Sequence, residues 1–326
     1  MLERLFNAAW YGRLQWTWLL WPLSVLVRVI TARKRNAYLG TQSKPYSVPV
    51  IVVGNITIGG TGKTPVVQAL VKYLQSLGYQ PGVISRGYGG ALTAFPHLIQ
   101  AKDSSHQVGD EPYMLYHSLR IPVVVDPIRT RAVSCILTAG VNVIISDDGL
   151  QHYQLHRDYE ICVIDGSRGL GNEQLMPVGP LREHKNRLNS VDYVLKSGTQ
   201  ISESHFQIEP VSWVNLRTNE VCELTRFKHK QDALAVAGIG NPDKFLKTLN
   251  DLNIHCAHNW FPDHHDYKAQ DFLDLTQQVL MTEKDAVKVK PFAGEDMWYL
   301  KISARLPESF LQHLKLKLEQ WKRDHG

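Results

Sequence analysis

The 326-residue sequence has few cysteines and little excess charge, and each absence limits what the protein can be. Its four cysteines are far apart and form no C-x-x-C pair, which fits a reducing compartment. The net charge is only +5 and the basic residues are scattered, so we expect no nucleic-acid partner. No internal repeat or low-complexity tract occurs, and no protein partner is evident. The length favours two domains.

The sequence also lacks an N-terminal apolar run long enough to cross a bilayer. The uncharged stretch between Arg13 and Arg28 is shorter than the roughly 20 residues that a spanning helix needs. Four of the eight tryptophans fall within residues 10–21, and Trp prefers the headgroup level of a membrane. Basic residues at 28 and 33–35 suit anionic lipid. We therefore expect residues 1–35 to form a helix on the cytoplasmic face of a membrane; the alternative is a helix packed on the protein's own core.

A glycine-rich turn follows the apolar run 48–53 and precedes a helical pattern over 63–77. Its residues are Thr57, Ile58, Gly59, Gly60, Thr61, Gly62, Lys63 and Thr64. Strand, turn and helix in this order aim backbone N–H groups and a helix N-terminus at one point, as a triphosphate requires. Lys63 would reach the β- and γ-phosphates and Thr64 would bind Mg²⁺. The alternative is a glycine-rich turn without a ligand.

Apolar runs suited to buried strands recur along the chain and alternate with helical patterns. They lie at 48–53, 82–85, 122–125, 141–146, 160–164 and 191–195, and then at 233–238, 254–259, 279–283 and 297–301. This alternation predicts an α/β fold with a mostly parallel sheet. Ligands of such sheets gather at the carboxyl ends of the strands.

Three groups of acids and histidines are candidates for chemistry. Asp147 and Asp148 end an apolar strand, where an acid can hold Mg²⁺, although a turn or helix cap is the alternative. Asp110 and Glu111 open a predicted helix, where they serve either the reaction or only the helix dipole. His264 stands among Asp263, His265 and Asp266, a pattern that favours a His–Asp hydrogen bond, with a surface turn as the alternative.

Three arginines lie near strand ends or in a loop and could hold phosphate in bidentate fashion. They are Arg86, Arg129 and Arg182. Each is weak evidence by itself.

Eight motifs in order along the chain resemble the tetraacyldisaccharide 4'-kinase family, the lipid A 4'-kinases. They occupy residues 53–65, 85–89, 109–112, 147–152, 179–183, 237–242, 261–264 and 282–288. The Trp-rich N-terminus is similar as well. The segment Lys196-Ser197-Gly198 departs from the Asn-Gly that the family pattern leads us to expect there, and His184 stands where we expect Pro. These departures affect only details of that strand end and loop.

The resemblance implies a P-loop NTPase-like fold with a second, smaller α/β domain. It also implies transfer of the γ-phosphate of ATP to the 4'-hydroxyl of a tetraacyldisaccharide 1-phosphate at the inner membrane. By the resemblance, Asp110 and His264 together form the general base: one takes the proton and the other orients or tunes it. Lys63 offsets charge on the transferring phosphoryl group. Thr64, Glu111 and either Asp147 or Asp148 bind Mg²⁺. Arg86, Arg129 and Arg182 are candidates for the lipid's own phosphate.

The predicted organisation has four parts: a membrane-associated helix at 1–35, the ATP-binding domain at 36–205, a hairpin bridge at 206–226 and a C-terminal α/β domain at 227–326.

An alternative function is that of a membrane-associated P-loop ATPase of the partitioning or metallochaperone type. The partitioning ATPases place a lysine before the two glycines, where this chain has Ile58. A nucleotide-gated scaffold without a phosphorylated product is the non-enzymatic alternative.

Overall fold

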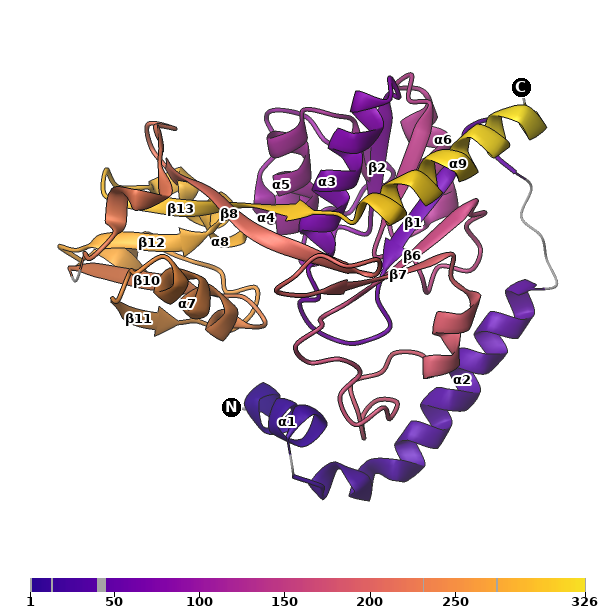
Figure 1. The fold of residues 1–326 in the computed structure, drawn as a ribbon, viewed down its shortest axis with the longest axis horizontal. Helices are drawn as coiled ribbons and strands as arrows, with labels where there is room; N and C mark the ends of the chain where they lie inside the picture. The colour runs from indigo at the N-terminus through magenta and orange to yellow at the C-terminus, as the bar shows by residue number, and fades with distance from the viewer. Residues whose placement is uncertain (1, 13, 40–44, 231, 274, 326) are drawn as a thin grey trace.

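One continuous sheet organises the chain. The computed structural model describes residues 2–12, 14–39, 45–230, 232–273 and 275–325. Among these residues, thirteen strands join in the order β11-β10-β12-β13-β8-β7-β6-β1-β5-β2-β4-β3, with β9 paired to β8 (Figure 1). The strand β8 therefore links two units of the same sheet.

The N-terminal unit has a parallel core, β7-β6-β1-β5-β2-β4, with β3 antiparallel at its edge. Its strands are β1 (Val50–Gly54), β2 (Pro81–Ser85), β3 (His97–Leu98), β4 (Val123–Val125), β5 (Val143–Asp147), β6 (Tyr159–Ile164) and β7 (Tyr193–Ser197). Its helices are α3 (Lys63–Ser76), α4 (Ser105–Val108), α5 (Asp110–Leu119), α6 (Arg129–Leu137) and the short η2 (Lys185–Ser190). The runs expected to be buried strands of this unit are strands, and β1, β2, β5 and β6 are buried along their whole length.

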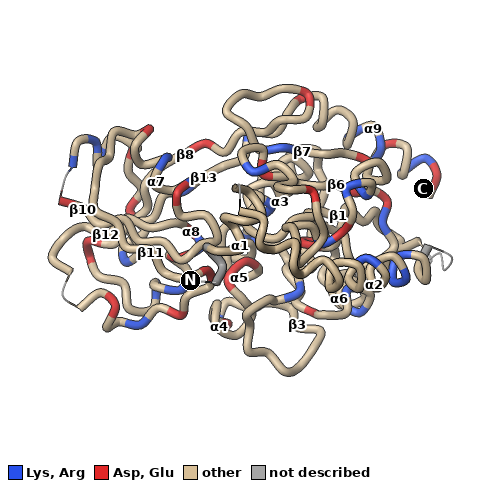
Figure 2. The backbone as a smooth tube through the Cα atoms, turned by 90° about the horizontal axis from the view of Figure 1, so that it is seen from below, with Lys and Arg blue, Asp and Glu red and all other residues tan. Residues whose placement is uncertain are grey.

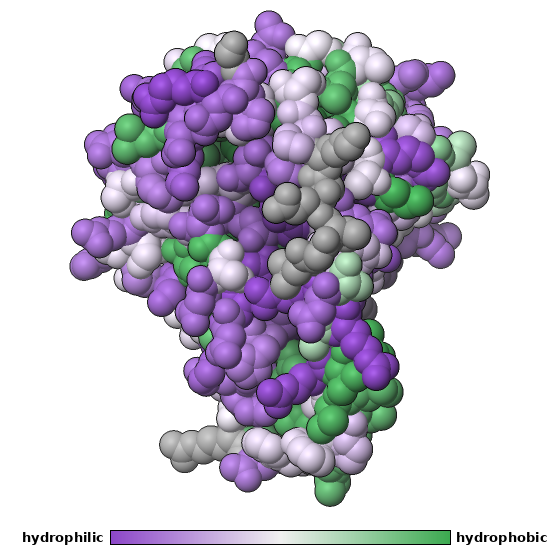
Figure 3. All heavy atoms as spheres, turned by 90° about the vertical axis from the view of Figure 1, so that its right-hand side faces the viewer, coloured by the Kyte–Doolittle hydropathy of each residue, from purple (hydrophilic) through white to green (hydrophobic). Residues whose placement is uncertain are grey.

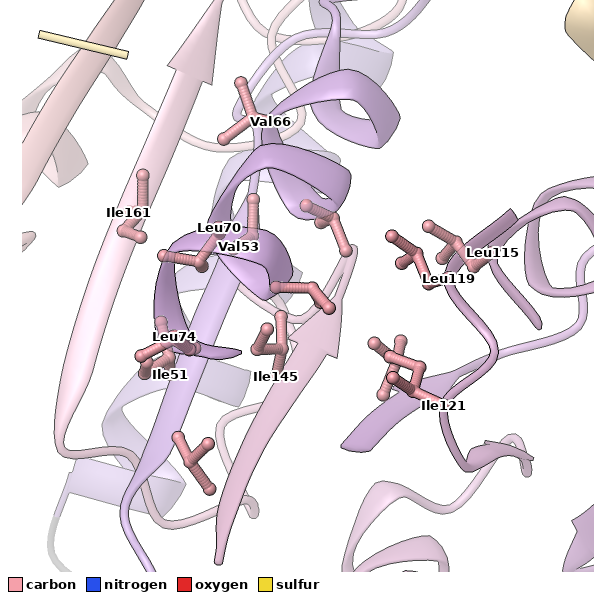
Figure 4. Packing of buried hydrophobic residues seen from close by; sticks show 14 of the residues in the cluster. Ile51, Val53, Val66, Leu70, Leu74, Leu115, Leu119, Ile121, Ile145 and Ile161 are labelled. Atoms are coloured by element: carbon pink, nitrogen blue, oxygen red, sulfur yellow. The ribbon is translucent and has the colours of Figure 1, made fainter. Parts of the chain in front are cut away.

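Helices cover both faces of this core. Val66 and Leu70 of α3 pack with Leu115 of α5 over Ile51 and Ile145 of the sheet (Figure 4). On the opposite face, α6 packs over the other side chains of the same strands. Burying alternate residues of a strand on opposite faces explains why these strands read as continuous apolar runs.

The C-terminal unit continues the sheet. Its strands are β8 (His205–Asn215), β9 (Val221–Cys222), β10 (Ala233–Ala237), β11 (Ala257–Trp260), β12 (Gln278–Thr282) and β13 (Met297–Arg305). Its helices are η3 (Leu224–Phe227), α7 (Pro242–Asp251), η4 (Ala269–Phe272), α8 (Glu283–Val289) and η5 (Lys290–Phe292). α7 packs on one face and α8 on the other. Strands β8 and β9 form the expected hairpin, but β8 also pairs with β7 and, antiparallel, with β13.

The last helix, α9 (Glu308–His325), leaves the C-terminal unit and crosses the N-terminal one (Figure 1). Phe310, Leu314 and Leu318 belong to the same core cluster as α3 and β1. The domain limits drawn from the sequence stay a prediction, and the end of the range 227–326 packs on the N-terminal unit.

The N-terminal segment is divided, whereas we expected one helix over residues 1–35. It forms α1 (Leu2–Tyr11), the 3₁₀ turn η1 (Trp16–Leu20) and α2 (Trp21–Leu39). Arg13, one limit of the uncharged stretch, lies outside the described residues. Gly12, a poor helix former, directly follows the end of α1. Pro22, in the first turn of α2, has no N–H to donate back into η1, which precedes it.

Both helices dock on the loop that follows β6. The indole Nε1 of Trp10 donates to the Pro177 carbonyl at 3.0 Å, and Ser24 Oγ donates to the Leu175 carbonyl at 2.8 Å. Among the described residues no single helix is long and apolar enough to span a membrane; the pair 5–11 and 16–38, bent by 98°, passes that test on length and composition.

Candidate active site

The glycine-rich turn has the backbone that a phosphate cradle needs. Gly59 and Gly62 have φ values of 102° and 87°, in the left-handed region that favours glycine. Helix α3 begins directly afterwards, at Lys63. Ile58 N donates to the Pro180 carbonyl at 2.9 Å, which ties the turn to the neighbouring loop. Backbone N–H groups and the positive end of α3 are thus held at one point, as predicted for a triphosphate site.

Two carboxylates stand at the carboxyl end of β5, beside this turn. Asp148 pairs with Lys63, with 3.6 Å between Oδ1 and Nζ, and with Arg182, with 2.9 Å between Oδ2 and Nη1. The positive charges of Lys63 and Arg182 lower the pKa of Asp148 despite its burial. Asp147 is 1% exposed, and burial, together with the charges of Glu111 and Asp148, raises its pKa to about 7.

These acids fit a magnesium ion. Oδ1 of Asp147 and Oδ1 of Asp148 are buried and have no hydrogen-bond partner. A buried carboxylate oxygen without a donor is costly, and a divalent cation would offset that cost. Among the described residues, no group of three or more His, Cys, Asp or Glu side chains is arranged to hold a metal ion. That is compatible with Mg²⁺, which usually binds one or two carboxylates together with substrate phosphates and water.

Asp110 and His264, which come from the two units, meet at this edge of the sheet. Asp110 is the first residue of α5, and His264 follows β11; His264 Nδ1 lies 3.3 Å from Asp110 Oδ2. His264 has a φ of 59°, a strained conformation for a non-glycine residue, and its N–H donates to the Gly238 carbonyl at 3.2 Å. Although burial raises the pKa of Asp110, the hydrogen bond from His264 and the charges of Lys288 and Lys284 lower it overall.

Glu111 and the three arginines differ in their partners and in their burial. Glu111 Oε1 lies 3.5 Å from Lys284 Nζ, in an ion pair between the two units. Arg129 is 2% exposed and donates to the carbonyls of Asp126 and Asp147, at 2.8 and 3.1 Å. Burial lowers the pKa of Arg129 to about 10. Arg86 and Arg182 line the same cleft as Arg129.

A single cleft of about 1470 Å³ joins most of these residues. Lys63, Thr64, Glu111, Asp147, Asp148 and His264 line it, together with the glycines of the turn and the three arginines. Asp110 lies directly behind His264. The structure therefore brings together the residues that the sequence singled out, and their individual roles stay predictions.

Several residues in or next to the cleft were not given a role from the sequence. Lys284 of α8 lies 3.3 Å from His264 Nε2, and Lys288, one turn further on, lies 3.5 Å from Asp110 Oδ2. Tyr88 packs edge-on to His264, with 5.3 Å between ring centroids. The sequence offered one signal for the lysines: they are four residues apart, a spacing that places them on the same side of a helix.

The fold and the site together define a class of protein. The sheet is parallel, a phosphate-binding turn follows its first strand, and acids stand at the end of a neighbouring strand. This arrangement is typical of P-loop nucleotide-binding enzymes.

Comparison with known proteins gives the family. The model of the Tetraacyldisaccharide-1-P 4'-kinase (LpxK) family matches residues 16–319, and the chain belongs to that family. A Tetraacyldisaccharide 4'-kinase of Vibrio cholerae serotype O1 is 43% identical over 100% of this chain and 99% of its own length. One of Legionella pneumophila is 42% identical over 93% of this chain and 94% of its own. A crystal structure of LpxK from Aquifex aeolicus in complex with ATP has a TM-score of 0.76 at 25% identity, covering 93% of this chain and 99% of that one. These matches support the kinase and not the partitioning-type ATPase.

Proposed function

We propose that the cleft transfers the γ-phosphoryl group of ATP to a sugar hydroxyl held between the two units. The chain is a tetraacyldisaccharide 4'-kinase, so the acceptor is the 4'-hydroxyl of the lipid A disaccharide precursor, a tetraacyldisaccharide 1-phosphate. One observation carries the assignment of the site: His264, which is hydrogen-bonded to Asp110, lines the cleft that also holds Lys63 and the phosphate-binding turn.

Residues of the chain accept the proton of the sugar hydroxyl and stabilise the charge on the transferring phosphoryl group. The 4'-oxygen forms a bond to the γ-phosphorus while the bond from phosphorus to the β–γ bridging oxygen breaks, and ADP leaves with that electron pair. The Asp110–His264 pair takes the hydroxyl proton, because a sugar hydroxyl is a poor nucleophile at neutral pH. Lys63 and the N–H groups of the turn offset charge on the transferring group.

Thr64, Glu111 and either Asp147 or Asp148 would hold Mg²⁺ together with the ATP phosphates. When bound, the ion would neutralise charge on the β- and γ-phosphate oxygens. The buried oxygens of Asp147 and Asp148 that lack a donor support this assignment.

We assign the lipid's own phosphate to the basic side of the cleft. Arg86 is the strongest candidate of the three arginines, since no carboxylate within the described part of the chain forms an ion pair with it. Arg182, by contrast, pairs with Asp148, and Arg129 is bound to carbonyls. A guanidinium fork suits a phosphate monoester.

The N-terminal helices give the cleft a membrane-facing side. Apolar side chains are exposed along η1 and α2, and they gather at the lower end of the molecule in Figure 3. They include Trp18, Leu19, Trp21, Leu23 and Leu26. Basic residues of α2 follow them in the chain (Figure 2), and one of these, Lys34, also lines the cleft. An apolar patch with a basic border is typical of a surface that binds the cytoplasmic leaflet. We propose that the enzyme works there, at the inner membrane, because its four-chain substrate stays in the bilayer.

The function is tested with γ-labelled ATP, Mg²⁺ and vesicles that carry the tetraacyldisaccharide 1-phosphate. Label should enter the lipid fraction, and a lipid whose 4'-hydroxyl is blocked should take none. Label recovered only as free phosphate would show an ATPase. Sedimentation with anionic vesicles, compared with vesicles of neutral lipid, tests the location separately.

A further inference from the structure

Helix α8 carries two lysines that reach across the boundary between the two units. It begins at Glu283, and the hydroxyl of the preceding Thr282 caps it by accepting from Asp285 N at 3.2 Å. Lys284 and Lys288 are four residues apart and so lie on one side of the helix. Figure 2 shows the acidic start of α5 next to α8.

Lys288 contacts residues of its own unit as well as Asp110. Its Nζ donates to the His265 carbonyl at 3.1 Å, lies 3.8 Å from Asp285 Oδ1 and stands 5.3 Å from the ring centroid of Tyr267. From there it reaches Asp110 Oδ2 at 3.5 Å, with a side chain that is 8% exposed. Lys288 does not line the cleft, and its contact with the Asp110–His264 pair is made through Asp110.

Lys284 determines which nitrogen of His264 carries the proton. An ammonium group only donates, so in the 3.3 Å contact between Lys284 Nζ and His264 Nε2 the imidazole nitrogen is the acceptor. The ring proton is then assigned to Nδ1, which donates to Asp110 Oδ2, so Asp110 is the member of the pair that is left to accept the proton of the substrate. Lys284 Nζ is held in place by Glu111 Oε1 and Asp263 Oδ1, each at 3.5 Å.

We propose that Lys284 and Lys288 are positioning residues for the transfer: Lys288 orients the Asp110 carboxylate and Lys284 fixes the tautomer and the orientation of His264. This inference rests on the proposed function of the Asp110–His264 pair. The pair needs such support because its members belong to different units and only one polar contact joins them. Helix α8 contacts both members at once, so it sets their relative geometry when the units meet.

The test compares Lys284→Met and Lys288→Met with Lys290→Met. Lys290 is a matched control, since it follows α8 directly, is exposed and contacts Asn219 Oδ1 at 3.3 Å, away from the pair. We expect kcat for lipid phosphorylation to fall by about 10–100-fold in the first two variants, with the KM for ATP unchanged. The control should keep its kcat.

A double-mutant cycle separates positioning from a structural role. If Lys288 acts through Asp110, Lys288→Met will have no further effect on kcat in an Asp110→Asn background, and Lys284→Met none in a His264→Ala background. Effects that multiply would overturn the inference, as would a higher KM for ATP with unchanged kcat. Lys284, at 19% exposure, gives a second variant should Lys288→Met fail to fold.

Failure of this inference is distinct from failure of the function. If the unmodified enzyme puts no label into the lipid, the proposed function fails. If it does so and both methionine variants match it in kcat, only the role of α8 is wrong.

Discussion

His264 Nδ1 lies 3.3 Å from Asp110 Oδ2, although the two residues are 154 positions apart in the chain. One stands at the first turn of α5 and the other after β11, in different units of the sheet. Under the proposed mechanism, a general base assembled from these two residues is complete only when both units are in contact. That requirement would limit ATP hydrolysis by water.

Replacing His264 by Ala should lower kcat by about 10²–10⁴-fold, because Asp110 loses the donor that orients it. The dissociation constant for ATP, measured by calorimetry, should stay the same, since His264 is not part of the phosphate-binding turn. Unchanged turnover would remove His264 from the mechanism.

Replacing Lys63 by Ala should be more damaging, because this cation lies at the start of α3, where the transferring phosphate is expected. We expect kcat/KM to fall by more than about 10³-fold in the labelled-lipid assay. Exposed Lys72 of the same helix is a suitable control. A Lys63→Ala variant with near-normal activity would contradict the assignment of the ATP site.

Asp147→Asn should abolish activity but stabilise the protein when Mg²⁺ and ATP are absent. The pKa of this acid is raised from 3.8 to about 7 in the fold. Between those two values the unfolded chain loses a proton that the folded chain keeps, so folding stability falls as pH rises through this window. Asn removes that penalty, and the gain, on the order of 1–3 kcal/mol, should be larger at pH 8 than at pH 5. Urea unfolding at both pH values measures it; an equal gain at both would show that ionisation of Asp147 is not the cause.

Leu19→Glu should weaken binding to anionic vesicles while leaving the fold intact. Leu19 is 84% exposed in η1, so its replacement removes no core contact. We expect at least a tenfold loss of vesicle binding in a sedimentation assay, because moving the charged Glu carboxylate into the membrane costs free energy. Exposed Leu316 of α9, on another face, provides the control substitution. Equal vesicle binding by both variants would contradict the membrane-facing assignment.

Lys244→Met should weaken a further contact between the units, on another side of the cleft from the Asp110–His264 pair. Lys244 Nζ of α7 lies 2.8 Å from Asp165 Oδ2, at the end of β6. Because Lys244 is 39% exposed, we expect a coupling energy with Asp165→Asn of only about 0.5–1 kcal/mol. A double-mutant cycle on kcat/KM measures it, and strict additivity would show that the pair does not hold the units together.

The chain's local patterns predicted most of the strands well. β1, β2, β5 and β6 read as unbroken apolar runs because both of their faces are covered by helices. The edge strand β11, expected at 254–259, runs from Ala257 to Trp260 and is largely exposed, so its sequence carries little hydrophobic signal. The N-terminal helix was expected to be continuous, but α1 ends at Tyr11, directly before Gly12.

The sequence by itself determined the phosphate-binding turn, since a glycine with positive φ, a lysine and a helix start are neighbours in the chain and need no distant partner. It also pointed to Asp110 and His264 as separate candidates. Only the tertiary structure decided that α8 faces this pair, that β8 joins both units and that α9 returns to the first core. These relationships depend on which surfaces pack together over long distances in the chain, and that packing is a property of the whole sheet, which no local pattern of residues encodes.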